Sequence, residues 1–106
     1  MILYSANEGD NMIGKVLKYI RICNDISTKE VSRMIGTTVS YVSDVENNRK
    51  KLSLDMIKRF SNCYNIETSK ILYLDELEQK GTDRKLILKE ILEYYIEKEK
   101  TTNKTL

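Results

Sequence analysis

The chain has 106 residues, of which 41% are hydrophobic and 32% are charged, so it can fill one small core and cover it with charge. It contains two Cys and no His, which excludes a tetrahedral Cys/His metal site within one chain and the Ser-His and Cys-His pairs of nucleophilic enzymes. It has no glycine-rich phosphate loop and no run of about 18 apolar residues. We therefore predict a cytoplasmic protein that is not an enzyme and that uses no cofactor, metal or membrane.

The net charge of +2 is too small to indicate a partner, but the charges are unevenly distributed. Residues 15–74 contain eleven Lys and Arg against six Asp and Glu, whereas residues 75–106 contain seven against eight. Contact with nucleic-acid phosphates requires such a local excess of positive charge. The first segment is therefore the better candidate for binding nucleic acid.

The N-terminal part predicts a loop followed by a helix. Residues 1–11 lack periodicity, and we interpret them as a flexible segment that is either an arm or an incidental extension before a start at Met12. Residues 12–23 form the first predicted helix, because its apolar residues recur on one face: Ile13, Val16, Leu17 and Ile20. Asn24 and Asp25 then break the helix.

Two short helices joined by a tight turn follow, over residues 28–47. Ser27 is a candidate N-cap with Glu30 three residues later, and Val31, Met34 and Ile35 form one apolar stripe. Gly36 ends this helix, and Thr38 caps the next one, whose buried side carries Val42 and Val45. Such a pair is typical of a helix-turn-helix unit, whose second helix enters the DNA major groove.

The remaining chain predicts three more helices. Ser53 begins one that ends near Asn65, and residues 67–80 form the next, before Gly81 breaks the chain. Residues 82–100 form an unusually apolar sixth helix, and residues 101–106 form a polar, frayed tail. Because the chain contains no Pro and only four Gly, we predict an all-α protein.

Several residues together resemble the Cro and phage-repressor helix-turn-helix domains, the XRE family. The resemblance covers about residues 16–72 and rests on a combined pattern: Ile26-Ser27, Glu30-Val31-Ser32, Ile35-Gly36, Val42-Ser43, Val45-Glu46-Asn47 and Arg49. It implies a five-helix lambda-repressor-like DNA-binding domain, here residues 12–80, with an additional C-terminal helix. The expected partner is double-stranded DNA.

The resemblance implies which residues read bases, and the helix starts and positive charges indicate which residues contact phosphates. Base reading falls on the exposed early part of the second motif helix: Val39, Ser40, Tyr41, Ser43 and Asp44. Phosphate contact falls on the helix starts and on residues 47–51, which we call the basic loop: Thr28, Lys29, Thr38, Asn47, Arg49, Lys50 and Lys51. A run of positive charges in a loop is otherwise read as solvated surface. The position of this run beside the reading helix favours contact with phosphates.

We expect different roles for the two acidic residues near the end of the motif. Asp44 either accepts a hydrogen bond from a cytosine amino group or pairs with a neighbouring Arg or Lys, and the sequence leaves both alternatives open. By resemblance, Glu46 forms an ion pair with Arg21 of the first helix and is part of the scaffold.

The two Cys are expected to be reduced and to pack as small hydrophobic residues. A redox switch between them is the alternative.

The sixth helix predicts a homodimer, because one helix-turn-helix unit touches few base pairs. Its candidate dimerisation stripe is Leu88, Ile91, Leu92 and Tyr95. The alternative is that the whole helix folds back on its own domain.

The leading function is a sequence-specific transcriptional repressor that acts as a dimer on two half-sites. The alternative is a protein-interaction module of the same fold, antitoxin-like or anti-repressor-like, whose C-terminal helix binds a protein.

Overall fold

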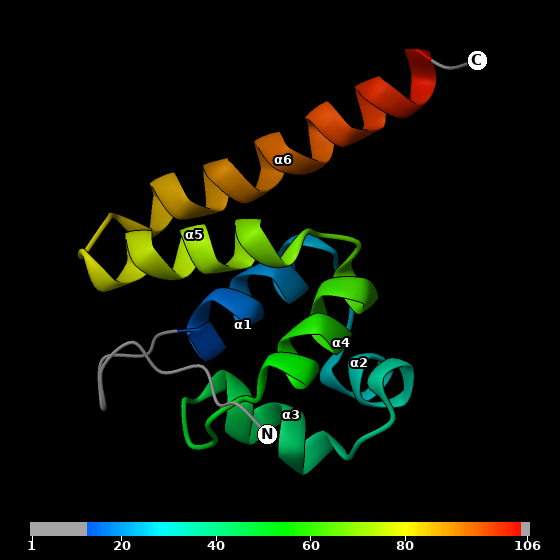
Figure 1. Cartoon of the computed structure of the whole chain (residues 1–106), viewed down its shortest axis with the longest axis vertical. Coiled ribbons are helices and arrows are strands. Elements are labelled where there is room, and N and C mark those ends of the chain that lie inside the picture. The colour runs from blue at the N-terminus through cyan, green and yellow to red at the C-terminus, as the bar shows by residue number, and fades with distance from the viewer. Residues whose placement is uncertain (1–12, 105–106) are drawn as a thin grey trace.

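A computed structural model describes residues 13–104 of the chain, with side chains described up to residue 101. The predicted N-terminal segment therefore lies outside the described residues. Six helices follow one another: α1 (Ile13–Cys23), α2 (Thr28–Ile35), α3 (Val39–Glu46), α4 (Leu54–Tyr64), α5 (Thr68–Gln79) and α6 (Arg84–Lys104). Figure 1 shows α2 and α3 at one end of the molecule, and α5 and α6 side by side at the other. The predicted all-α class is confirmed.

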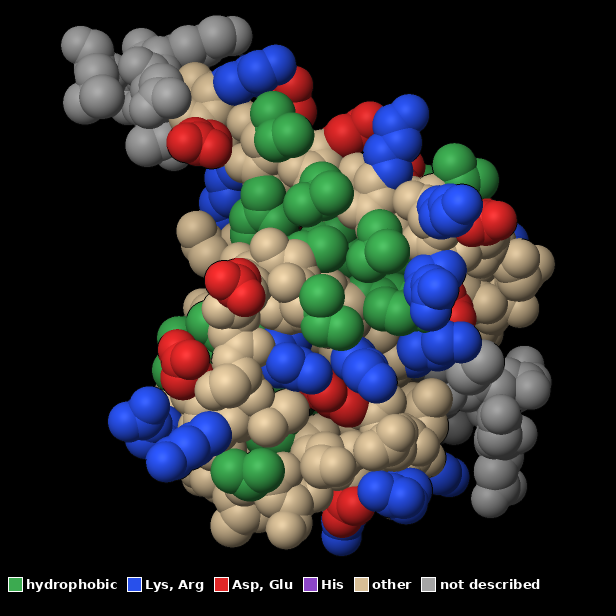
Figure 2. All heavy atoms as spheres, turned by 180° about the vertical axis from the view of Figure 1, so that it is seen from behind, with side chains coloured by type: hydrophobic (Ala, Val, Ile, Leu, Met, Phe, Trp, Pro, Cys, Tyr) green, Lys and Arg blue, Asp and Glu red, His purple; other side chains and the backbone are tan. Residues whose placement is uncertain are grey.

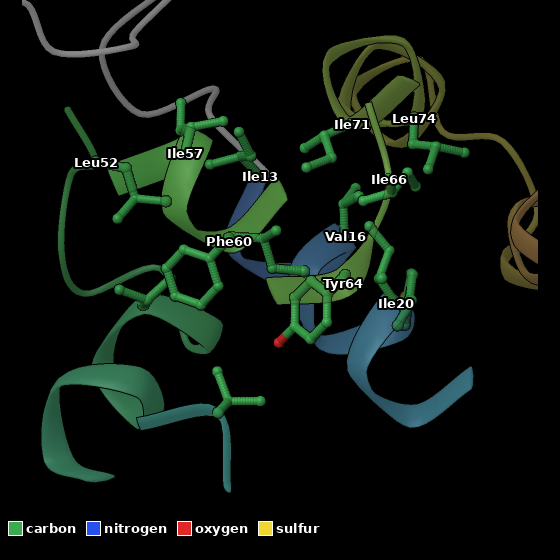
Figure 3. Packing of buried hydrophobic residues seen from close by; sticks show 14 of the residues in the cluster. Ile13, Val16, Ile20, Leu52, Ile57, Phe60, Tyr64, Ile66, Ile71 and Leu74 are labelled. Carbon is green, nitrogen blue, oxygen red and sulfur yellow. The ribbon is translucent and has the colours of Figure 1, made fainter. Parts of the chain in front are cut away.

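Helix α1 is the centre of the core, because it packs against α3, α4, α5 and α6. Its residues Val16, Leu17 and Ile20 are fully buried. Figure 3 shows Phe60 and Tyr64 of α4 beside this helix, with their ring centroids 6.1 Å apart. The apolar stripe that the sequence places on α1 is thus the inner wall of one continuous core.

Local capping determines where α4 begins and ends. The Ser53 Oγ accepts a hydrogen bond from the Met56 amide at 3.2 Å, which satisfies one of the unpaired amides of the first turn. Asn65 ends the helix in a left-handed conformation with φ 51°, which Asn tolerates better than most residues. Both predicted boundaries are confirmed.

Two predictions about helices are wrong in detail. Met34 was placed on the apolar stripe of α2, but its side chain is 59% exposed, because the neighbours of α2 cover only Val31, Ser32 and Ile35. The predicted tail begins too early, since α6 continues beyond residue 101 to Lys104. The Thr101 hydroxyl donates to the Glu97 carbonyl at 3.0 Å within this extension, and no Gly or Pro interrupts it.

One side of α6 folds back on its own domain, which corrects half of the predicted dimerisation stripe. Ile91 is fully buried, together with Ile87. The Tyr95 hydroxyl donates to the Tyr64 carbonyl and accepts from the Asn24 side chain at 3.1 Å. Ile91 therefore lies in the core of this chain rather than in a contact between subunits, and Tyr95 packs against that core, whereas Leu88 is half-buried and Leu92 is 48% exposed.

Burial also determines the chemistry of the cysteines. Burial raises the pKa of both Cys23 and Cys63, and both thiols are free and pack beside the core. A thiol with a raised pKa carries less thiolate at neutral pH and reacts more slowly. This observation favours the prediction that the two Cys act as small hydrophobic residues.

None of the described helices has the length and apolar character to cross a membrane.

Candidate nucleic-acid interface

The turn between α2 and α3 is held by caps on both sides. Gly36 adopts φ 74°, a conformation that glycine takes without strain, and its amide donates back to α2. The Thr38 Oγ1 then accepts from the Tyr41 amide at 3.0 Å and begins α3. At the start of α2, the Ser27 Oγ accepts from the Glu30 amide at 3.1 Å. The two helices therefore meet through a turn whose geometry is determined locally.

The predicted reading residues divide into exposed and half-buried side chains. Val39 is 44% exposed, and Ser40 beside it is also exposed. Ser43 and Asp44 are half-buried, and Tyr41 packs partly against the core. Burial raises the pKa of Tyr41, so its hydroxyl stays protonated and able to donate a hydrogen bond. The first turn of α3 is thus the most accessible part of the helix.

An ion pair joins α1 to the end of α3. The Arg21 Nε donates to one Glu46 carboxylate oxygen at 2.7 Å and Nη2 donates to the other at 3.1 Å. The third nitrogen, Nη1, donates to the Ile26 carbonyl at 2.9 Å. Only 16% of the Arg21 side chain and 5% of the Glu46 side chain are exposed. The bidentate contact that the resemblance implies is therefore present, and it holds α3 against α1.

The predicted phosphate-contacting residues lie at the helix ends. Thr28 and Lys29 open α2, Thr38 is exposed at the start of α3, and Arg49, Lys50 and Lys51 are exposed in the following loop. Asn47 differs from them, because its side-chain amide donates to the Ser43 carbonyl at 2.9 Å and so caps the end of α3. Asn47 therefore has a structural contact in addition to its predicted role.

Asp44 makes an ion pair within the chain. The Arg49 Nε donates to the Asp44 Oδ1 at 3.2 Å, with 64% of the Arg49 side chain and 36% of the Asp44 side chain exposed. Of the two alternatives for Asp44, the structure shows pairing with a neighbouring Arg. Asp44 and Arg49 were assigned separately, to bases and to phosphates, and the fold brings them together.

Comparison with known proteins identifies the motif. A family model described as helix-turn-helix matches residues 17–71, more than half of the chain. The chain belongs to the XRE-type helix-turn-helix family. This helix-turn-helix protein is accordingly a DNA-binding transcription regulator, as the resemblance implied.

Solved structures agree with the helix-turn-helix protein in fold. A crystal structure of the clp gene regulator ClgR from Corynebacterium glutamicum superposes with a TM-score of 0.66 and 16% identity, covering 81% of this chain and 92% of that chain. The restriction-modification controller protein C.AhdI from Aeromonas hydrophila superposes with a TM-score of 0.56 and 23% identity, covering 61% of this chain and 98% of that chain. These likenesses confirm the lambda-repressor-like fold. No curated protein matches the chain in sequence.

Sequence reasoning missed two residues that position the interface of this helix-turn-helix protein. The Gly14 amide of α1 donates to the Asn48 Oδ1 at 3.1 Å, just beyond the end of α3. Asn48 has φ 57°, so the chain reverses direction there before the basic loop. The available signal was an Asn two residues after the last residue of α3, since Asn tolerates the left-handed conformation. Its partner, 34 positions earlier, has no local signal.

Proposed function

We propose that this protein is a transcriptional repressor that binds as a dimer to an operator with two half-sites. The observation that carries the proposal is the exposed first turn of α3, a helix that lies with α2 at one end of the molecule (Figure 1) and that the basic loop follows directly. A capped helix with such a surface fits the major groove of B-DNA. Repression would follow from occlusion of a promoter by the bound dimer.

Specific contacts follow from the chemistry of the exposed side chains. Val39 would touch a thymine methyl group, and the Ser40 hydroxyl would donate to or accept from a base edge. Tyr41 and Ser43 would flank these contacts. Phosphates would be held by hydroxyls, an amide and ammonium groups around the motif: Thr28, Lys29, Thr38, Asn47, Lys50 and Lys51.

Removing a phosphate contact tests the DNA-binding proposal. Lys50→Ala should weaken binding to all DNA sequences alike and lower the slope of log affinity against log salt by about one, because one fewer counterion is released. Binding of labelled genomic fragments, including the upstream region of the protein's own gene, measures both quantities. Lys89→Ala is the matched control, because it removes the same charge from an exposed position on α6 and should leave the slope unchanged.

Equal salt slopes for wild type, Lys50→Ala and Lys89→Ala would contradict the placement of the basic loop on phosphate. A chain that retards no genomic fragment at low salt would contradict the function itself.

The proposed dimer uses an apolar surface that the fold leaves exposed. We name it the α1–α6 patch: Ile22, Leu88, Leu92 and Ile96. Ile22 and Leu88 line one cavity of about 620 Å³ that reaches the C-terminal end of α3, and Leu92 and Ile96 continue along α6 from Leu88 at four-residue spacing. Figure 2 shows hydrophobic side chains gathered over this region. Contiguous exposed apolar surface usually indicates an interface.

Charging the patch tests the dimer. Leu92→Glu and Ile96→Glu together should convert a dimer into a monomer, since each carboxylate would be buried in an apolar contact. Operator affinity should then fall roughly hundredfold, because the two half-sites are no longer bound by linked subunits. Light scattering measures the mass, and a gel shift measures the affinity. Leu86→Glu is the control, because Leu86 is exposed on α6 outside the four-residue spacing of the patch.

The dimer places a geometric demand on the complex. The two α3 helices should lie about 34–36 Å apart, so that they meet successive major grooves. A wild-type monomer at micromolar concentration with the same operator affinity as the charged variant would rule out the dimer proposal.

A further inference from the structure

The chain turns back onto the reading helix directly after α3. The Arg49 amide donates to the Asp44 carbonyl at 2.8 Å, and the Arg49 Nε donates to the carboxylate of the same residue at 3.2 Å. Backbone and side chain of Arg49 are therefore both attached to Asp44. This arrangement places the guanidinium beside α3 instead of leaving it to extend from the loop.

A contact with the core holds this turn. Asn48, with φ 57°, reverses the chain, and its Oδ1 accepts from the Gly14 amide of the central helix α1. The position of Arg49 is thus determined by α1 and α3 together. A side chain that is held before binding loses less conformational entropy when it contacts a ligand.

The pairing leaves the recognition edge of the guanidinium accessible. Within the described part of the chain, Arg49 uses Nε for Asp44, while its side chain remains 64% exposed. The two terminal nitrogens form the planar fork that matches the O6 and N7 acceptors of guanine. Lysine lacks this planar fork, so its ammonium, which acts as a point charge, would recognise the guanine less specifically.

The same arrangement explains how the reading helix can carry a negative charge at Asp44. A carboxylate on the reading helix would be repelled by DNA phosphates, and pairing with Arg49 neutralises it. Because the carboxylate accepts from Nε, it also orients the guanidinium beside α3. Asp44 therefore does not have to contact a base itself.

We infer that Arg49 reads a guanine in the major groove and that Asp44 is its positioning residue, an inference that rests on the proposed DNA-binding function. It reassigns both side chains. Arg49 moves from phosphate contact to base reading, and Asp44 moves from accepting a cytosine amino group to orienting Arg49. The operator is expected to contain a G·C pair in each half-site at the position that this Arg49–Asp44 pair meets.

Selection of bound sequences from random DNA tests the inference on the full chain. Wild type should select a motif with a guanine in each half-site, and Arg49→Ala and Arg49→Lys should both lose preference for that guanine by roughly tenfold or more. Arg49→Lys keeps the charge, so it distinguishes base reading from phosphate contact. Asp44→Asn should weaken preference at the same base pair, because the amide holds the guanidinium less firmly. Lys50→Ala, by comparison, should weaken binding without changing the motif.

Three outcomes would overturn the inference. The first is an Arg49→Lys variant that keeps the wild-type motif and affinity, which would mean a phosphate contact. The second is a change at different base pairs for the Asp44 and Arg49 variants, which would mean independent reading. The third is a wild-type protein that selects no motif, which would also reject the proposed function, whereas the first two leave that function intact. Thermal melting confirms that each variant is folded.

Discussion

Replacing Gly14 by Ala is expected to lower the free energy of unfolding by about 3 kcal/mol, although Ala is the better helix former. The added Cβ would lie 1.8 Å from the Val45 carbonyl oxygen and 2.6 Å from the Asn48 Oδ1. The carbonyl belongs to the backbone at the end of α3, so it cannot rotate away as a side chain can. Helices α1 and α3 must separate, which also disturbs the contact of the Gly14 amide with Asn48.

Urea denaturation of wild type and variants measures this loss. Gly36→Ala is the matched control, because Gly36 has φ 74° and no atom within 4 Å of an added Cβ. Its cost comes from the backbone conformation alone and should be about 1 kcal/mol. Equal losses for the two variants would show that the close approach of α1 and α3 does not limit residue size at position 14.

The second large effect is expected from Glu46→Ala, which should destabilise the domain by about 2–3 kcal/mol. The change removes both acceptors of the bidentate contact and leaves the guanidinium of Arg21 without its carboxylate partner. In the wild type, the hydrogen bond with Glu46 raises the pKa of Arg21. The guanidinium also stays charged in the variant, because arginine is not deprotonated in proteins. The loss is smaller than for a completely buried pair, because Arg21 is 16% exposed and still donates to the Ile26 carbonyl.

An exposed ion pair provides the comparison for this experiment. Lys89 and Glu93 approach to 3.8 Å on α6, with side chains 70% and 57% exposed. Glu93→Ala should therefore change the free energy of unfolding by less than about 0.5 kcal/mol. Replacing both partners of the buried pair, with Arg21→Met and Glu46→Leu, should recover much of the stability lost in Glu46→Ala. No difference between Glu46→Ala and Glu93→Ala would mean that the buried pair is not a structural contact.

Helix boundaries were predictable because the chemistry that determines them is local. Ser27, Thr38 and Ser53 each accept a hydrogen bond from an amide three residues later. Gly36 and Asn65 end helices in the left-handed conformation that their residue types tolerate. Each of these signals spans only a few residues and can be recognised without knowing the fold.

Long-range contacts were predictable only where the family resemblance supplied them. Arg21 and Glu46 are 25 positions apart, and no local pattern connects them. The contact between Gly14 and Asn48 spans 34 positions, and neither a local pattern nor the resemblance predicted it. Periodicity failed for Met34 as well, since the width of an apolar stripe does not determine how much of it the neighbouring helices cover.

The amino-acid sequence by itself determined the helices, their caps and the helix-turn-helix motif, because these depend on residue type and short spacing. Only the tertiary structure decided which side of α6 is buried. Ile91 lies in the core and Tyr95 packs against it, whereas Leu92 and Ile96 remain exposed. The sequence pattern of an amphipathic helix does not distinguish these two sides. The tertiary structure also selected between the two alternatives for Asp44. Its pairing with Arg49 depends on the reversal at Asn48, which the contact with α1 holds in place.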